Sequence, residues 1–218
     1  MLFTKGMKIL FIGDSLTDAG ASYGSPDDIG AGYVRYIRDY MYSKYPELEL
    51  DFINKGISGH RSSDLINRWE KDVLDIKPDF LSILIGTNDV WRQFDNLVLD
   101  VVDADMFEEN LRYMVTSAKN VGIEKILIGE IPPVEKGFTS TYDCSLALEN
   151  EGNLMIAEYN KRVHKIAAEF NLYICPLHKI FSDNMNKASN IKYTYDGVHP
   201  SSTGIMTYAI SVINSLSL

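Results

Sequence analysis

Residues 9–17 read ILFIGDSLT, an apolar run that ends in glycine and is followed at once by Asp14 and Ser15. Such a run is too short for a helix, and apolar residues on both faces are typical of a strand buried on both sides of a parallel sheet. Similar runs, bounded by Gly, Asn, Pro or Asp, occupy residues 50–53, 80–85, 125–131 and 172–175. The sequence therefore predicts a mainly parallel sheet of five strands.

Longer stretches with helical spacing lie between these runs. In residues 62–74 the apolar residues recur every three or four positions; Ser62 or Ser63 can cap the start of this helix, and Pro78 can stop it. Further helices are expected in residues 34–45, 107–118, 156–170 and 207–216. Strands that alternate with helices predict an open, doubly wound α/β sheet. Residues 135–152 are polar and are expected to form an excursion over the surface.

The composition indicates one soluble domain over residues 1–218, with 45% hydrophobic and 23% charged residues. The net charge of −9 repels phosphate groups, so we expect neither a nucleic-acid nor a membrane partner. Residues 1–12 lack the long apolar segment of an export signal, so we expect a cytoplasmic protein. The two cysteines, Cys144 and Cys175, are too few for a disulfide scaffold or a four-cysteine metal site and are expected to be free thiols.

Polar motifs follow the first three predicted strands directly, where ligands bind in open parallel sheets. They contain Ser15, Gly59 and Asn88, and a fourth motif near the end of the chain contains Asp196 and His199. Taken singly, each motif has an ordinary structural explanation as a tight turn or a helix cap. Since no single motif is decisive, the argument for a function depends on their combination.

Together the motifs supply every group that acyl transfer requires. Ser15 is the candidate nucleophile, His199 the candidate base, and Asp196 can hold the other ring nitrogen of that histidine. The backbone N–H groups of Ser15 and Gly59 and the side-chain amide of Asn88 can form an oxyanion hole. The sequence therefore predicts a catalytic triad and three oxyanion donors at one edge of the sheet.

These motifs resemble those of the SGNH, or GDSL, hydrolase superfamily, whose Ser, Gly, Asn and His correspond to Ser15, Gly59, Asn88 and His199. The similarity is greatest to acetylxylan esterases and related carbohydrate O-deacetylases, in residues 11–15, 32–34, 45–48, 54–59 and 88–93. The resemblance implies a three-layer α/β/α, flavodoxin-like fold and ester hydrolysis through an acyl-serine, with no metal and no organic cofactor. It also implies an acetylated saccharide as substrate and a homo-oligomeric assembly.

Other polar residues have weaker arguments for a role. Trp91 and Arg92 follow the Asn88 motif and can line the mouth of the site, although packing at the sheet edge and a surface ion pair explain them equally well. His60 adjoins Gly59 but is also explained as a solvated turn residue. His164 is expected on a solvated helix face and His178 in a loop. Asp14 is expected to stabilise the turn before Ser15 and to take no part in the chemistry.

Three alternative functions remain open from the residues alone. A thioesterase or lysophospholipase of the same superfamily would use the same catalytic residues and differ only in its pocket. A phosphotransferase similar to haloacid dehalogenases needs a second Asp two residues after the first, where this chain has Leu16. A non-catalytic carbohydrate-binding module would not need Ser15, Asn88, Asp196 and His199 together.

Overall fold

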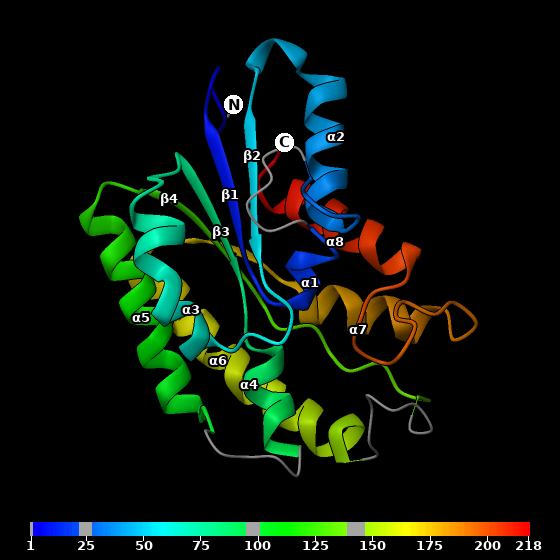
Figure 1. Ribbon diagram of the computed structural model, residues 1–218. Coiled ribbons are helices and arrows are strands. Elements are labelled where there is room, and N and C mark those ends of the chain that lie inside the picture. Colours follow the sequence, from blue (N-terminus) through cyan, green and yellow to red (C-terminus); the bar gives the residue numbers. More distant parts are fainter. Residues whose placement is uncertain (1, 22–27, 95–100, 139–146) are drawn as a thin grey trace.

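Five parallel strands form the centre of the protein in a computed structural model that describes residues 2–21, 28–94, 101–138 and 147–218 (Figure 1). The strands are β1 (Lys8–Gly13), β2 (Asp51–Gly56), β3 (Phe80–Leu84), β4 (Lys125–Gly129) and β5 (Tyr173–Cys175). Their order across the sheet is β2-β1-β3-β4-β5. This order is that of flavodoxin-like folds, in which the chain changes direction across the sheet between β1 and β3. The predicted α/β class is confirmed.

The central strand β1 is apolar on both faces because helices cover both sides of the sheet. Successive side chains of a strand point to opposite faces. Accordingly, Leu10 and Ile12 pack into one hydrophobic core, whereas Ile9 and Phe11 pack into the other. All four side chains are at most 1% exposed. Each core lies between the sheet and the helices on one of its faces, as the predicted α/β/α arrangement requires.

The longer helices divide between the two faces of the sheet (Figure 1). One face carries α2 (Tyr33–Lys44), α7 (Leu177–Lys187) and α8 (Ser202–Ser215), and the other carries α3 (Ser62–Trp69), α5 (Ala104–Asn120) and α6 (Asn153–Phe170). The shorter elements are α1 (Ser15–Asp18), α4 (Thr87–Trp91), the 3₁₀ turns Pro46–Leu48 and Arg92–Phe94, and the π-helical turns Glu70–Leu74 and Leu148–Gly152. Helices α1 and α4 begin immediately beyond β1 and β3, at the strand ends where the chain reverses its order.

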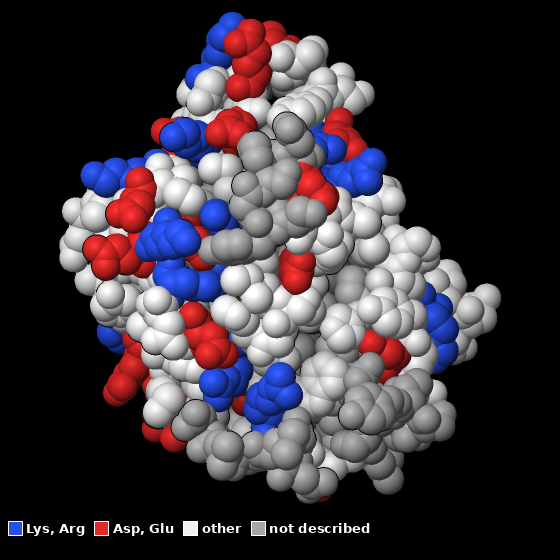
Figure 2. All heavy atoms as spheres, viewed as in Figure 1, with Lys and Arg blue, Asp and Glu red and all other residues white. Residues whose placement is uncertain are grey.

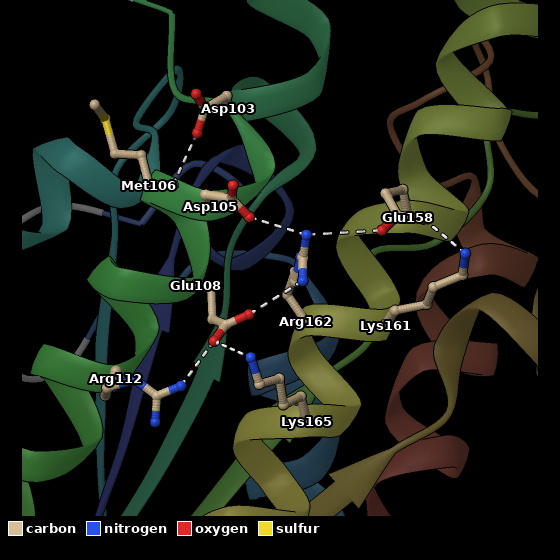
Figure 3. Close-up of polar contacts among 9 residues, drawn as sticks. All are labelled: Asp103, Asp105, Met106, Glu108, Arg112, Glu158, Lys161, Arg162 and Lys165. Carbon is tan, nitrogen blue, oxygen red and sulfur yellow. Dashed lines mark hydrogen bonds and ion pairs between the residues drawn. The ribbon is translucent and has the colours of Figure 1, made fainter.

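Ion pairs fasten α5 to α6 on the outer side of the sheet (Figure 3). Glu108 of α5 accepts from Arg112 at 2.7 Å and also pairs with Arg162 at 3.4 Å and Lys165 at 2.7 Å, both on α6. Arg162 also contacts Asp105 at 2.9 Å. Exposed pairs each contribute only about 0–1 kcal/mol, but several charges in one network hold two helices in a fixed register. On the face shown in Figure 2, acidic and basic side chains are interspersed.

Several predicted element boundaries are wrong, for identifiable reasons. Ser62 does not cap α3, because the helix begins at that residue and Arg61 precedes it as the cap position. The closing helix begins at Ser202, five residues early, because the Ser201 hydroxyl accepts from the N–H of Gly204. The sequence also predicts a polar excursion over the surface in residues 135–152; of its described residues, 135–138 and 147–152, Lys136, Asn150 and Glu151 are exposed, whereas the side chains of Glu135, Leu148 and Glu149 are buried.

Two further predictions can be compared with the described residues. Cys175 is a buried free thiol, and burial raises its pKa to about 12, so it is not a reactive thiolate at neutral pH. Cys144 lies outside the described residues. Within the described part of the chain, no helix has the length and apolar character needed to cross a bilayer.

Candidate active site

Ser15 is the first residue of α1 and follows β1 after a single residue, Asp14. Asp14 caps this short helix, because its Oδ1 accepts a hydrogen bond of 3.0 Å from the N–H of Leu16. The expectation that Asp14 stabilises the turn is confirmed. The Ser15 hydroxyl therefore lies at the C-terminal edge of the central strand, on a backbone that the Asp14 cap and the hydrogen bonds of α1 hold.

The Asp14 carboxyl group is fully buried, and its Oδ2 has no hydrogen-bond partner within the described structure. Burial raises the pKa of Asp14 to about 7 against the opposing hydrogen bond from Leu16, and the nearby Asp89 carboxylate adds to the increase. Burial likewise raises the pKa of Asp89 to about 6, although its carboxylate accepts from the N–H and hydroxyl of Ser62. Two buried acids thus lie near each other, and one of them, Asp14, belongs to the nucleophile turn.

His199 and Asp196 complete a continuous hydrogen-bonded chain with Ser15. The His199 Nε2 lies 3.0 Å from the Ser15 Oγ, and its Nδ1 lies 2.6 Å from the Asp196 Oδ2. Burial alone would raise the pKa of Asp196, but hydrogen bonds from the His199 ring and from the N–H groups of Val198 and His199 lower it overall. Asp196 is therefore ionised at neutral pH and can orient an imidazole that accepts a proton from Ser15.

A sharp turn brings the Asp and His side chains onto the same side of the backbone. Gly197 between them has φ = +99°, in the region that favours glycine. The turn closes through the Tyr195 N–H, which donates to the His199 carbonyl at 3.0 Å. The sequence Asp-Gly-Val-His therefore supplies both the catalytic groups and the residue that its turn requires.

The candidate oxyanion donors gather at the same edge of the sheet. Gly59 has φ = +81° and lies between Ser58, which lines the cavity beside Ser15, and His60. The Asn88 Nδ2 donates to the His60 carbonyl at 3.0 Å. Because an amide nitrogen carries two N–H groups, this bond fixes the orientation of the side chain, and the second N–H can donate to a ligand.

A cavity of about 350 Å³ opens beside the Ser15 hydroxyl and the His199 ring. Leu16, Ala19, Gly20, Ala31, Ser58, Tyr195, Pro200 and Ile205 also line it. The Trp91 ring is tilted against the His199 ring, with 6.2 Å between ring centroids and 56° between planes. The Arg92 guanidinium approaches Gly59, since a Cβ added there would be 3.6 Å from its Nη2. Substrate-binding roles for Trp91 and Arg92 stay predictions.

The other histidines have different environments. The His60 Nδ1 accepts from the Arg68 Nε at 3.2 Å, so its ring faces a cation. Burial and the charge of Arg68 lower the pKa of His60. A substrate-binding role for His60 stays a prediction. His164 is exposed as expected, but its Nε2 also lies 2.6 Å from the Glu130 Oε1. His178 belongs to α7, which corrects the prediction of a loop position.

Tyr195 is a candidate site residue that the sequence analysis missed. Its ring stacks on His199 with 5.7 Å between centroids and 15° between planes, and the residue is 66% exposed. A lone tyrosine before Asp196 carries no motif, and its only sequence clue is its closeness to the Asp–His pair. Stacking leaves one face of the imidazole against an aromatic ring and places that ring at the mouth of the cavity.

The chain matches the model of the family described as "GDSL-like Lipase/Acylhydrolase family" over residues 11–205. The chain belongs to this family. An acetylxylan esterase from Geobacillus stearothermophilus is 35% identical to this GDSL-like chain over 99% of its length and 96% of the relative. The crystal structure of Axe2, an acetylxylan esterase from that organism, has a TM-score of 0.87 at 32% identity and covers 100% of this chain and 97% of its own. The SGNH hydrolase fold that the resemblance implied is confirmed.

Other solved members extend the comparison. LAE5, an α/β hydrolase enzyme from the metagenome of Lake Arreo in Spain, has a TM-score of 0.86 at 25% identity, over 100% of this chain and 98% of its own. Three Axe2 structures are described as catalytic mutants, in which alanine replaces a serine, an aspartate or a histidine. Those residue types are the ones that the present GDSL-like protein joins by hydrogen bonds at the edge of its sheet.

Proposed function

We propose that this protein is a serine esterase that hydrolyses O-acetyl esters of xylan-derived or related saccharides through an acetyl-serine intermediate. The observation that carries the proposal is the hydrogen-bonded chain from Ser15 through His199 to Asp196, at the strand ends where open α/β sheets bind ligands. The similarity to acetylxylan esterases along the whole chain supports the acetyl group and the xylan-related substrate.

In the first half of the reaction, the Ser15 Oγ attacks the acetyl carbonyl carbon while the His199 Nε2 takes its proton over the existing distance of 3.0 Å. Asp196 accepts the Nδ1–H bond and stabilises the imidazolium that forms. The carbonyl oxygen becomes an oxyanion, which the N–H groups of Ser15 and Gly59 and the Asn88 amide receive. One such donor typically contributes about 10²–10³-fold to turnover.

Collapse of the tetrahedral intermediate breaks the bond to the sugar oxygen, and His199 gives that oxygen its proton. The sugar leaves as an alcohol and the acetyl group stays on Ser15. His199 then takes a proton from a water molecule, which attacks the acetyl carbonyl. Collapse of the second tetrahedral intermediate breaks the bond between the carbonyl carbon and the Ser15 Oγ, His199 returns its proton to that oxygen, and acetate leaves. General acid–base help of this kind is worth roughly 10²–10⁴-fold.

The lining of the site is compatible with an acetyl group on a neutral sugar. The cavity of about 350 Å³ has apolar walls from Leu16, Ala19 and Ile205, which suit an acetyl methyl group. At its mouth, the exposed ring of Tyr195 offers a stacking surface for the apolar face of a sugar ring. These features suit an acetylated saccharide, and the similarity to acetylxylan esterases favours it over a long acyl chain.

The test is a panel of substrates that all require the same catalytic residues but need differently shaped binding pockets. Acetylated xylo-oligosaccharides, 4-nitrophenyl esters of increasing acyl length, an acyl-CoA and a lysophospholipid are compared by kcat/KM. We expect acetate release from the acetylated saccharides and a steep decrease in kcat/KM beyond acetyl among the 4-nitrophenyl esters. Absence of hydrolysis of every acetyl ester contradicts the proposal, and a higher kcat/KM on acyl-CoA or lysophospholipid replaces the substrate assignment.

A further inference from the structure

The segment that carries Asp196 and His199 has no helix or strand to hold it. Between α7 and α8, the described backbone contains only turns and an isolated bridge between Thr194 and Pro200. Buried side chains of Tyr193 and Val198 fix the two ends of the turn. A catalytic group must nonetheless be held within roughly 0.5 Å of its productive position. The hydrogen bonds of Asp196 and of the Tyr195 N–H lie within the turn, so residues 194–197 also need contacts from another part of the chain to hold them in place.

Glu135 fills this role through a set of four hydrogen bonds. Its carboxylate is buried, and the Oε2 accepts from the N–H of Tyr193 at 3.1 Å and from the N–H and hydroxyl of Thr194, both at 2.7 Å. The Glu135 N–H donates to the Gly197 carbonyl at 2.8 Å. One residue from the segment after β4 therefore binds the catalytic turn on both sides of Asp196.

The Thr194 hydroxyl extends this contact into the turn itself. It has one proton, which it donates to Glu135, so its lone pairs are available to accept the N–H of Gly197 at 3.1 Å. Gly197 is the residue with φ = +99° that brings Asp196 and His199 to one side. Glu135 and Thr194 thus fix the conformation from which both catalytic side chains project.

We call the hydrogen bonds of Glu135 with residues 193, 194 and 197, together with that of the Thr194 hydroxyl, the clamp. On the outer side of the clamp, no close packing of the described side chains takes the place of these bonds. A cavity of about 440 Å³ opens there, lined by Glu135, Lys136, Ile191 and Lys192 among others. The Lys192 Nζ lies 3.9 Å from the Glu135 Oε1 at the wall of this cavity, where it partly balances the carboxylate charge. Without the carboxylate, two backbone N–H groups and one hydroxyl would lose their partner beside an open space, and the turn could relax into it.

We propose that Glu135 is a positioning residue for the esterase reaction, which acts through Thr194 and Gly197 to hold the His199 ring against Ser15. The inference rests on the proposed function, because it concerns the geometry of that site. Glu135 touches neither Ser15 nor His199 through its hydrogen bonds and ion pair in the described structure. Its removal should misplace the base and leave the nucleophile turn unchanged.

The sharpest test uses Thr194, where two substitutions differ by one hydroxyl. Thr194→Val keeps the shape and removes the hydroxyl that bridges the Glu135 carboxylate and the Gly197 N–H, whereas Thr194→Ser keeps this bridge; the backbone bond from Glu135 to Gly197 is present in both variants. We expect Thr194→Val to lower both kcat on 4-nitrophenyl acetate and the rate of Ser15 labelling by a fluorophosphonate by roughly 10–100-fold. Thr194→Ser should restore both rates, and Glu135→Ala should behave like Thr194→Val.

Asn160→Ala is the matched control for lost buried hydrogen bonds. Asn160 holds the backbone of Ile131 on the same post-β4 segment through bonds of 2.8 and 2.9 Å. This variant should lower the Tm and leave the labelling rate of Ser15 close to that of the wild type. Equal labelling rates in folded Thr194→Val and Thr194→Ser would overturn the proposed role of Glu135.

A spectroscopic measurement separates this inference from the proposed function. The His199 proton shared with Asp196 should give a strongly downfield NMR signal, which is assigned by its loss in His199→Ala. The signal should move or broaden in Thr194→Val and persist in Thr194→Ser and Asn160→Ala. If the wild type hydrolyses no acetyl ester, the proposed function fails, yet this comparison still decides whether the clamp holds His199. An unchanged signal in Thr194→Val and Glu135→Ala contradicts the inference, whatever the activity.

Discussion

Ser15 and His199 lie 3.0 Å apart, but the backbone holds them there in opposite ways. The Ser15 turn continues the central strand β1, which pairs with β2 on one side and β3 on the other, and it passes directly into α1. The His199 turn has no regular element, and one buried carboxylate accepts three of its donors. Regular hydrogen bonding fixes the nucleophile, whereas side-chain hydrogen bonding fixes the base.

Substitutions should therefore have different effects in the Ser15 turn and in the His199 turn. The pairing of β1 and the backbone hydrogen bonds of α1 hold the Ser15 turn, so the effect of a substitution near Ser15 should be confined to the atoms that it removes. A substitution near His199 can release the whole turn. The reaction nevertheless requires both regions at once. The largest expected effect is therefore the loss of kcat when the reacting side chain of either region is removed.

Removing either reacting side chain should abolish most turnover. We expect Ser15→Ala and His199→Ala each to lower kcat on an acetyl ester by about 10⁴-fold or more, and the double variant to lose little beyond either single one, because the two groups act as a unit. Steady-state kinetics on the three variants measure this, with thermal unfolding to verify that each remains folded.

Ser58→Ala is the control for the serine, since Ser58 lines the same cavity but its hydroxyl donates to Asp18 at 2.6 Å. It should keep most of the wild-type kcat. Two independent, additive losses in the double variant would mean that the strand region and the turn region do not form one catalytic unit.

The oxyanion donor from the strand side should have the next largest effect. Asn88→Ala removes an amide that the His60 carbonyl holds in place, and we expect kcat to decrease by about 10²–10³-fold with little change in KM. The control is Asn110→Ala, because Asn110 supports the neighbouring Ser62 hydroxyl at 2.9 Å without belonging to the site. A larger change in KM than in kcat for Asn88→Ala would assign that amide to ground-state binding.

The same contrast explains how far the sequence predicts the structure. The strands, their parallel pairing and the placement of Ser15 and Asn88 at one edge were predictable, because apolar runs and the turns after them are local in sequence. The hydrogen bond between Asp196 and His199 was predictable from their spacing of three residues. The family similarity now supports the esterase class, whereas the cytoplasmic location and homo-oligomeric assembly stay predictions.

Features that depend on distant contacts were not predictable. Glu135 lies in a segment that reads as polar surface, and only the fold brings it to Thr194, 59 positions later. Tyr195 carries no motif, and only its stacking on His199 identifies it as a candidate site residue. Likewise, Ser62 reads as a helix cap but donates to Asp89, because burial of that acid requires donors.

The smallest expected effect is on the pH dependence of the free energy of unfolding. It differs between Asp14 of the Ser15 turn and Asp196 of the His199 turn. The pKa of Asp14 in the folded protein is about 7, against an ordinary value of 3.8. Between these values the folded state holds a proton that the unfolded state has lost, so the free energy of unfolding should decrease as the pH rises from about 4 to about 7. Asp14→Asn cannot titrate and should remove about 2–3 kcal/mol of the decrease between about pH 5 and about pH 8.

Asp196 should give the opposite slope, which makes Asp196→Asn the matched variant. Its pKa in the folded protein is lowered, so the stabilisation is complete above the ordinary value and is lost as the pH falls through the lower folded value. Urea unfolding of the wild type and both variants, from pH values below the ordinary aspartate pKa of 3.8 up to about pH 8, measures the two slopes. If Asp14→Asn leaves the slope at neutral pH unchanged, the acid behind Ser15 is ionised in the folded protein. The nucleophile turn would then hold a buried charge of the same sign as the one that the base turn requires.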